Sequence, residues 1–402
     1  MTDTGFAIRD VRVFDGEDVV EHSTVHIKGG FIESVATQFD STADIDVIDG
    51  RGKTLLPGLI DSHTHAQPPS LENALLFGVT TELDMFSCPE WMDSQRRDAA
   101  ERNDLADVRS ASIGATVLGG HPSMMIGTYF DEQYPVVNSL QDAFPFVAAR
   151  VAEGADYIKL LIDDGTSLGH DSHTLGEDVA RAIVDAAHDH GKMAVAHVTS
   201  LAGAEQALRA GVDGLVHIFF DRPPTDEIIA QALDAGVFIT PTLSTVGSLA
   251  SDIDGTHLAN DDRARPLIPA SWHENLCQCW HLGSPGSIDH AIEATRRMHE
   301  AGVDILAGTD AAGIGVVGTA HGVSMHGELE LLVRAGLSPV QALRAATSSP
   351  ARRFGLTDRG RIAPGLQADL LLVEGDPTRE ITATLSIAGI WRRGDKLSRV
   401  PR

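Results

Sequence analysis

The chain reads Leu55-Leu56-Pro57-Gly58-Leu59-Ile60-Asp61-Ser62-His63-Thr64-His65 at residues 55–65, an apolar run that ends in two histidines one residue apart. The run predicts a buried β-strand, and residues two apart in a strand project from the same face. The imidazoles of His63 and His65 are therefore expected to reach one point in space, where a metal ion could be bound. Two polar residues at a strand end would give the same spacing, so the rest of the chain has to decide between these interpretations.

The segment from residue 57 to 355 repeats a pattern of strand, turn and helix. After the strand at 59–65, candidate strands follow at 80–85, 108–117, 157–163, 193–198, 214–219, 238–243 and 305–310. Helical stretches at 175–190, 202–210, 225–235 and 289–301 are each followed closely by a glycine, the usual helix stop. This alternation predicts an α/β fold, a parallel (β/α)8 TIM barrel over residues 57–355. The longest irregular region, 248–285, is expected to contain helical rim structure.

Both chain ends have a different pattern. Short alternating runs separated by glycine turns occupy residues 6–14, 24–27 and 31–35, and similar runs return at 368–373 and 387–391. Such runs are typical of antiparallel strands. We therefore expect a small β-sandwich domain built from both termini, residues 1–56 plus 356–402.

Composition narrows the class of protein. The chain has 402 residues, of which 43% are hydrophobic and 22% charged, with a formal net charge of −26. This charge repels nucleic acid and anionic membranes, and no uncharged apolar run is long enough to span a membrane. The first residues lack a secretory signal, and an odd number of cysteines suits a reducing compartment, so a cytoplasmic location is expected. The expected partner is a small-molecule substrate; barrels of this kind often associate as homo-oligomers.

Ionisable residues end several of the predicted strands, where the active sites of TIM barrels lie. They are His63, His65, Lys159, His197, His217 and Asp310. One histidine in an apolar strand is as compatible with a satisfied core position as with a ligand. A lysine there is costly to bury without a partner. Six such residues at one end of a barrel favour a functional site.

These strand-end residues and the segments around them resemble the amidohydrolase superfamily of metal-dependent hydrolases. The matching segments are the Pro57–His65 signature, Tyr157-Ile158-Lys159, Ala196-His197-Val198, Val216-His217 and Ala307-Gly308-Thr309-Asp310. The segments 337–343, 346–351 and 360–369 also look like the return of a superfamily chain from barrel to β domain. The chain most resembles the branch of imidazolonepropionase-like proteins, carboxylated-lysine dipeptidases related to prolidase, and aryl-amide and urea hydrolases.

The resemblance implies two divalent metal ions, commonly zinc. The more buried ion would be held by His63, His65 and Asp310, and the second by His197 and His217. Lys159, carboxylated by CO₂, would bridge them, since a carbamate offers two anionic oxygens and an ammonium none. A hydroxide shared by the metals would be the nucleophile, and Asp310 would carry its proton to the leaving group. The implied activity is hydrolysis of an amide-type C–N bond, in an acyl or aryl amide, dipeptide, carbamate or urea.

The sequence offers fewer candidates for contact with the substrate than for metal binding. His121 follows the third strand and is expected either to hydrogen-bond the substrate carbonyl or oxyanion or to order its own loop. Tyr129, Phe219 and Phe220 could line an apolar pocket, although core packing is the commoner fate of such residues. Arg222 is expected to bind a carboxylate or to pair with the preceding aspartate. The loops favour an apolar or aromatic substrate group over a strongly anionic one.

Three other functions share part of this pattern. A mononuclear deaminase or imidazolone-type ring hydrolase would have no use for a bridging Lys159. A lactone, ester or phosphoester hydrolase would keep the same six ligands. A non-catalytic scaffold on this fold would be expected to lose ligands, whereas this chain retains them.

Overall fold

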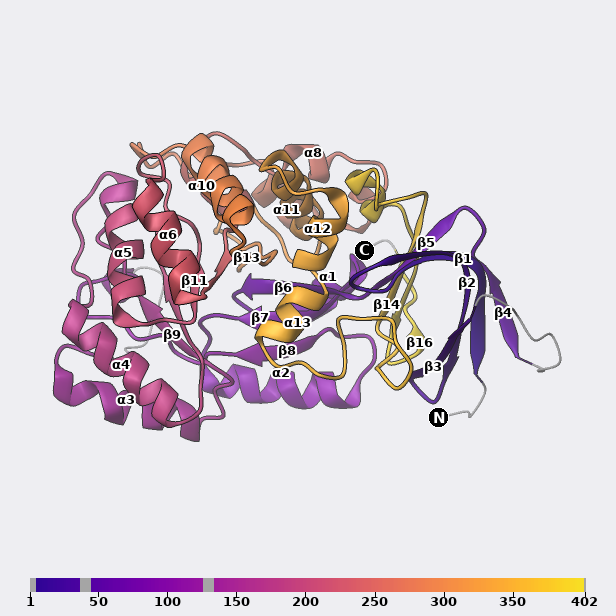
Figure 1. The fold of residues 1–402 in the computed structure, drawn as a ribbon, viewed down its shortest axis with the longest axis horizontal. Helices are drawn as coiled ribbons and strands as arrows, with labels where there is room; N and C mark the ends of the chain where they lie inside the picture. The colour runs from indigo at the N-terminus through magenta and orange to yellow at the C-terminus, as the bar shows by residue number, and fades with distance from the viewer. Residues whose placement is uncertain (1–4, 37–44, 126–133, 401–402) are drawn as a thin grey trace.

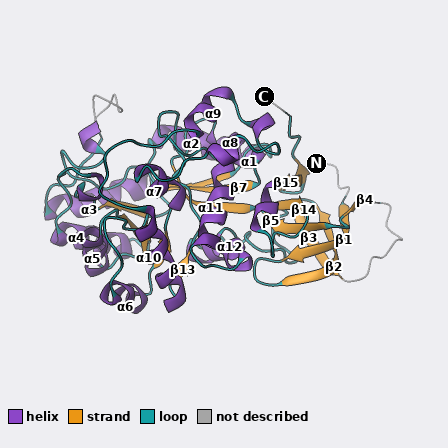
Figure 2. Cartoon of the chain, turned by 90° about the horizontal axis from the view of Figure 1, so that it is seen from above, coloured by secondary structure: helices purple, strands orange, loops and turns teal. Residues whose placement is uncertain are grey.

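The computed structural model describes residues 5–36, 45–125 and 134–400 of the chain. Strands from both chain ends lie together at one end of the molecule, and the segment between them forms an α/β part beside these strands (Figure 1). The view from above shows the same division, with helices gathered in one part and mostly strands in the other (Figure 2). We call these the β part and the α/β part.

The β part is one sheet in the order β16-β15-β14-β5-β1-β2-β3, with β4 paired to β1. Its strands are β1 (Phe6–Phe14), β2 (Val19–Lys28), β3 (Phe31–Ala36), β4 (Asp46–Asp49), β5 (Lys53–Pro57), β14 (Leu370–Glu374), β15 (Ile387–Arg392) and β16 (Asp395–Lys396). The two chain ends meet in the antiparallel pair of β5 and β14.

All these strands belong to one hydrogen-bonded network, and their arrangement as the expected sandwich stays a prediction. β1 has two register shifts against β2 and a left-handed Asp10 (φ 56°). The other edge of β1 pairs first with β4 and then with β5, which keeps all the strands in one hydrogen-bonded network. The domain boundaries at residues 56 and 356 stay a prediction.

The two faces of this sheet pack against different partners. Leu55 and Leu370 belong to a hydrophobic cluster within the β part, whereas their neighbours Leu56 and Leu371 belong to the main cluster of the α/β part. Successive side chains of a strand point to opposite faces, so one face forms the core of the β part and the other packs on the α/β part. The β part is thereby fixed beside the strands that carry the candidate ligands.

The α/β part contains a strand at each of the predicted places. They are β6 (Leu59–Thr64), β7 (Val79–Asp84), β8 (Asp107–Ser110), β9 (Ile158–Leu161), β10 (Ala194–His197), β11 (Gly214–Val216), β12 (Phe238–Thr240) and β13 (Asp304–Ile305). Every pair among them is parallel, and neighbours in space are neighbours in sequence. This is the strand order that a TIM-barrel-type α/β fold requires.

The strands do not form one continuous ladder. β6-β7-β8 and β13-β12-β11-β10-β9 are separate sheets, and isolated bridges of Ala115 to Leu160 and of Thr64 to Ala311 lie at the two junctions between them. The strand predicted at 108–117 stops at Ser110, because Ser112 has a left-handed backbone (φ 58°). At the other junction the carboxylate of Asp61 accepts the backbone N–H of Thr309 at 3.0 Å and replaces a ladder hydrogen bond.

Helices alternate with these strands and continue beyond them. They are α1 (Ser70–Leu76), α2 (Pro89–Glu101), α3 (Leu140–Ala152), α4 (Glu177–Asp189), α5 (Leu201–Ala210), α6 (Asp226–Ala235), α7 (Leu243–Leu249), α8 (Thr256–Ala259), α9 (Ala270–Leu276), α10 (Ile288–Ala301), α11 (Val323–Arg334), α12 (Pro339–Ala345) and α13 (Ser348–Arg353). Short 3₁₀ turns are η1 (Ser123–Met125), η2 (Thr166–Leu168), η3 (Arg265–Leu267) and η4 (Ile381–Leu385). The region 248–285 contains α8, η3 and α9, so the expected helical structure is present there.

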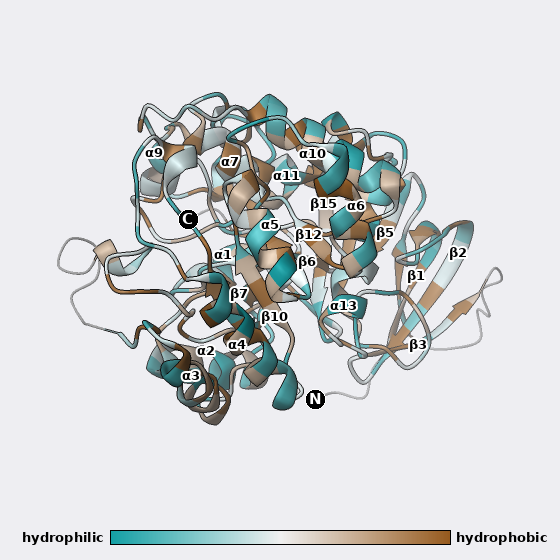
Figure 3. Ribbon diagram, turned by 60° about the vertical axis from the view of Figure 1, so that its left-hand side comes forward, coloured by the Kyte–Doolittle hydropathy of each residue, from teal (hydrophilic) through white to brown (hydrophobic). Residues whose placement is uncertain are grey.

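The helix ends follow the predicted glycine signals. Gly211, Gly236 and Gly302 are the left-handed C-caps of α5, α6 and α10, a conformation that glycine adopts without a Cβ clash. α5 and α10 carry hydrophilic and hydrophobic residues side by side (Figure 3), as amphipathic helices on a sheet should. Within the described ranges, no helix combines the length and the apolar character needed to cross a membrane.

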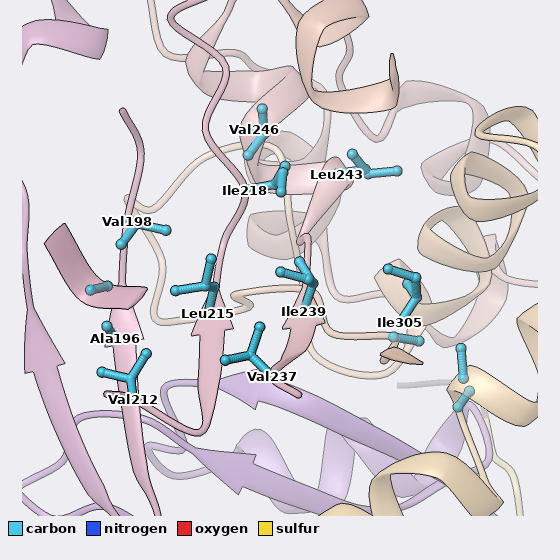
Figure 4. Close-up of a cluster of buried hydrophobic side chains, with 14 of the residues drawn as sticks. Ala196, Val198, Val212, Leu215, Ile218, Val237, Ile239, Leu243, Val246 and Ile305 are labelled. Atoms are coloured by element: carbon cyan, nitrogen blue, oxygen red, sulfur yellow. The ribbon is translucent and has the colours of Figure 1, made fainter. Parts of the chain in front are cut away.

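Both faces of the central strands are buried, which explains their unbroken apolar runs. Leu215 of β11 and Ile239 of β12 pack toward the helices in the cluster of Figure 4. The alternate residues Val216 and Phe238 belong to an inner cluster that also includes Ile60 of β6. The two sheets therefore enclose a common interior, and the polar residues at the strand ends lie at its rim.

Candidate metal centre

The candidate ligands lie where the strands end. His63 is in β6 and His65 follows it, Lys159 is in β9, His197 ends β10, and His217 follows β11. Asp310 follows β13 after a short loop and completes the set predicted from sequence. Local apolar sequence forms each strand, and the parallel arrangement brings their carboxyl ends to one edge.

Asp310 lies between the two histidines of the first strand. Its Oδ1 is 3.2 Å from Nε2 of His63 and 3.0 Å from Nε2 of His65. The backbone of Asp310 is left-handed (φ 55°), and its N–H donates to the carbonyl of His63 at 2.7 Å. Gly308 permits this approach, because a Cβ there would lie 2.8 Å from the nitrogen of His63.

The imidazoles of the other strands complete one cluster. The ring centroids of His217 lie 4.5 Å from those of both His63 and His197. Ligand atoms of His63, His217 and Asp310 all lie within 4.8 Å of one another. The structure therefore brings together the imidazoles and the carboxylate that the sequence predicts.

In three of these imidazole rings, one nitrogen lies within hydrogen-bond distance of a neighbouring group. Nδ1 of His65 donates to the carbonyl of Phe86 at 3.2 Å, and Nδ1 of His217 lies 2.6 Å from the Thr242 hydroxyl. Nε2 of His197 lies 3.3 Å from the carboxylate of Asp163. The opposite nitrogens of His197 and His217 are left for another ligand, whereas Nε2 of His65 faces Asp310.

His63 gives a direct test of whether this set fits a metal. Its ring is completely buried, and its Nδ1 has no hydrogen-bond partner within the described residues. Burial lowers the pKa of His63 to about 3, so the imidazole is neutral and offers a lone pair. Buried neutral imidazoles with a carboxylate are a usual donor set for zinc, and the residues present fit such an ion.

Lys159 is the remaining predicted ligand. Its side chain is 2% exposed, and burial lowers its pKa to about 7. The charge of Asp310 acts in the opposite direction and favours the ammonium. A lysine in this environment is close to the neutral amine that carboxylation by CO₂ needs. The carbamate itself stays a prediction.

Carboxylates behind the cluster were not predicted from the sequence. Asp61 accepts the N–H groups of His63 and Thr309 and the Thr309 hydroxyl, and so ties the first strand to the segment before Asp310. Asp163 accepts the N–H of Gly165 and the hydroxyl of Thr199, each at 3.0 Å, besides facing His197. Asp61 lies within the 55–65 signature and Asp163 two residues after β9, so their positions in and just after the strands were the available signal.

Replacing Asp163 by asparagine is expected to weaken zinc binding by about 10- to 100-fold, because His197 loses the anion that orients it. Competition titration with a chelator measures this change. Asp164→Asn is the matched control, since among the described residues that carboxylate bonds the nearby Thr166 and no ligand. Equal affinities of the two variants would contradict the role of Asp163.

The residues predicted to contact the substrate differ in how they lie relative to the ligand cluster. The ring of His121 stacks on His197 with a centroid distance of 5.0 Å, and burial lowers its pKa to about 4. Phe219 and Phe220 are completely buried in the main hydrophobic cluster. Arg222 is 64% exposed and pairs with Asp221 at 2.8 Å. Tyr129 lies outside the described residues. The roles of these residues toward a substrate stay predictions.

Two other histidines that follow the eighth strand have partners outside the ligand set. His321 forms a buried pair with Glu82 at 2.7 Å, and His326 contacts the Phe77 carbonyl and the Thr384 hydroxyl. These contacts serve packing between the helices and the strands.

Known proteins match this fold and sequence. Imidazolonepropionase of Deinococcus radiodurans is 26% identical over 422 aligned positions, which cover 94% of this chain and 93% of that protein. Ochratoxinase of Aspergillus niger is 24% identical over 278 positions, 66% of this chain, and the chain spans about half (51%) of its length. A crystal structure of a Xaa-Pro dipeptidase with methionine in its active site superposes with a TM-score of 0.76 at 24% identity, covering 98% of this chain and 100% of that one.

The family assignment rests on a match to a family profile. Residues 54–396 match the sequence profile of the amidohydrolase family, a range that includes every candidate ligand described above. The resemblance inferred from the strand-end residues is thereby confirmed. The chain belongs to the amidohydrolase family.

Proposed function

We propose that this protein is a binuclear metal-dependent hydrolase that cleaves an amide-type C–N bond. The observation that carries the proposal is the convergence of four histidines and Asp310 at one end of the strands, with the buried Lys159 near enough for charge interactions with His63 and Asp310. The relatives support the reaction class, since ochratoxinase and the dipeptidase share this fold or sequence. Carboxylate, imidazole and lysine together favour two ions over one.

The residues would divide between two divalent ions, commonly zinc. His63, His65 and Asp310 would hold the more buried ion, and His197 and His217 the second. Lys159, as the carbamate, would reach both. When bound, the ions would lower the pKa of a water toward about 7 and polarise the scissile carbonyl.

Side chains of the protein would transfer the protons and orient the substrate and the metal ligands. Asp310 would accept the proton of the attacking water and deliver it to the leaving nitrogen, because its carboxylate faces the cluster from the loop after β13. His121, stacked on His197, would hydrogen-bond the substrate carbonyl as charge develops on its oxygen. Asp163 and Thr242 would keep His197 and His217 in their orientations.

Metal content and a substrate panel test the proposal. We expect about two zinc ions per chain and hydrolysis of members of an amide, carbamate and urea panel. One ion per chain with deamination activity would favour the mononuclear enzyme. Turnover confined to lactones or esters would assign a different bond, and absence of both metal and turnover would indicate a scaffold.

A further inference from the structure

The segments that follow the strands are nearly free of cationic side chains. We call residues 65–69, 85–88, 111–125, 134–139, 162–176, 198–200, 217–225, 241–287 and 306–322 the mouth loops, because they follow the strands on the side of the candidate metal centre. Their sequences contain no lysine and only Arg222, Arg263 and Arg265, while acidic residues are more numerous. A substrate that enters over these loops therefore meets few positive groups.

Two of these arginines already have carboxylate partners. The guanidinium of Arg222 binds Asp221, as described above. Arg263 binds Asp261 at 2.6 Å and also donates to the Thr382 carbonyl and the Ser386 hydroxyl, which attaches it to η4 and its C-terminal end. Arg265 is exposed within η3, on the helical rim. None of the three is a preformed carboxylate site beside the ligands.

Positive charge gathers at the opposite end of the strands. A crevice of about 520 Å³ there is lined by Arg96, Arg109, Arg359, Arg392 and Arg393. It also contains Asp107, the first residue of β8, and Asp156, which precedes β9. These residues mark the amino ends of the strands, so the arginines of this region face away from the candidate metal centre.

Apolar side chains are exposed on the mouth loops instead. They are Leu118, Met124, Leu282 and Ile314. Leu118 and Met124 flank His121 in one loop, and contacts to His173 and Ser172 join this loop to the one after β9. Each of these two apolar residues lies three positions from His121, whose ring stacks on His197 of the ligand cluster.

We propose that this site selects amides, carbamates or ureas that bear an apolar group and no carboxylate near the scissile bond. Free dipeptides and N-acyl amino acids would be poor substrates. A carboxylate is normally bound by a guanidinium or ammonium, and leaving it without such a partner costs its desolvation. The acidic field of the chain adds repulsion. This inference rests on the proposed function, because it concerns the substrate of the same site.

A matched pair of probes tests it. N-Benzoyl-2-phenylethylamine and N-benzoyl-phenylalanine have the same scissile amide and differ only by a carboxylate. Their dissociation constants are measured by calorimetry on the purified full-length protein, and their hydrolysis by benzoate release. We expect the neutral probe to bind at least about tenfold more tightly, about 1.4 kcal/mol, and to be cleaved preferentially.

A variant that adds a positive charge near His121 tests the same inference in the opposite direction. Leu118→Arg is expected to improve binding of the acid by about tenfold, whereas Leu118→Gln, with similar length and no charge, should not. Tighter or equal binding of the acid by the unchanged protein would overturn the inference, and so would no binding of the neutral probe at millimolar concentration. Selective binding without hydrolysis of either probe would count against the proposed function only.

Discussion

Asp310→Asn is expected to lower kcat by about 10²- to 10⁴-fold, the usual contribution of a positioned general acid or base. Asparagine keeps the shape of the side chain but cannot accept and return a proton. KM should change much less, since the loss falls on the transition state. Steady-state kinetics with the best substrate of the panel gives kcat and KM separately.

Asp310 is also a predicted metal ligand, so zinc content is measured on the same protein and activity is expressed per bound metal. Asp289→Asn is a suitable control, because that side chain is 80% exposed and lies on α10. Turnover per metal equal to that of the unchanged enzyme would show that another group moves the proton.

Lys159→Ala is expected to lower zinc content from about two ions per chain and to reduce activity at least about a hundredfold. The reason is that alanine offers no oxygen to join the two halves of the ligand set. Elemental analysis and activity are measured side by side. In the unchanged protein, ¹³C-labelled bicarbonate should give a carbamate signal by NMR that is absent from this variant.

Chemical rescue distinguishes a bridge from a packing role. Short carboxylic acids should partly restore both metal content and activity to Lys159→Ala by supplying the two missing oxygens. Lys192→Ala, which alters a half-buried lysine before β10, should resemble the unchanged enzyme. Undiminished metal content and turnover in Lys159→Ala would refute the bridge.

Local sequence was sufficient for much of the fold. Apolar runs such as that before His63 predict the strands, and glycines such as Gly211 and Gly302 mark the helix ends. Both signals depend on residues close in the chain, through strand and helix periodicity and the left-handed C-cap. The strand at 108–117 was predicted too long, because a single left-handed residue, Ser112, interrupts an otherwise suitable pattern.

The sequence by itself determined the elements, their order and the residues at the strand ends. Parallel βα units place all carboxyl ends on one side, so neither the ligand list nor the family resemblance required coordinates. Only the tertiary structure decided which ring nitrogens are already bound, how Asp61 joins the two junction strands, and that Phe219 and Phe220 are buried in the core. These features depend on contacts between residues far apart in the chain, whose distances and hydrogen bonds no local pattern records.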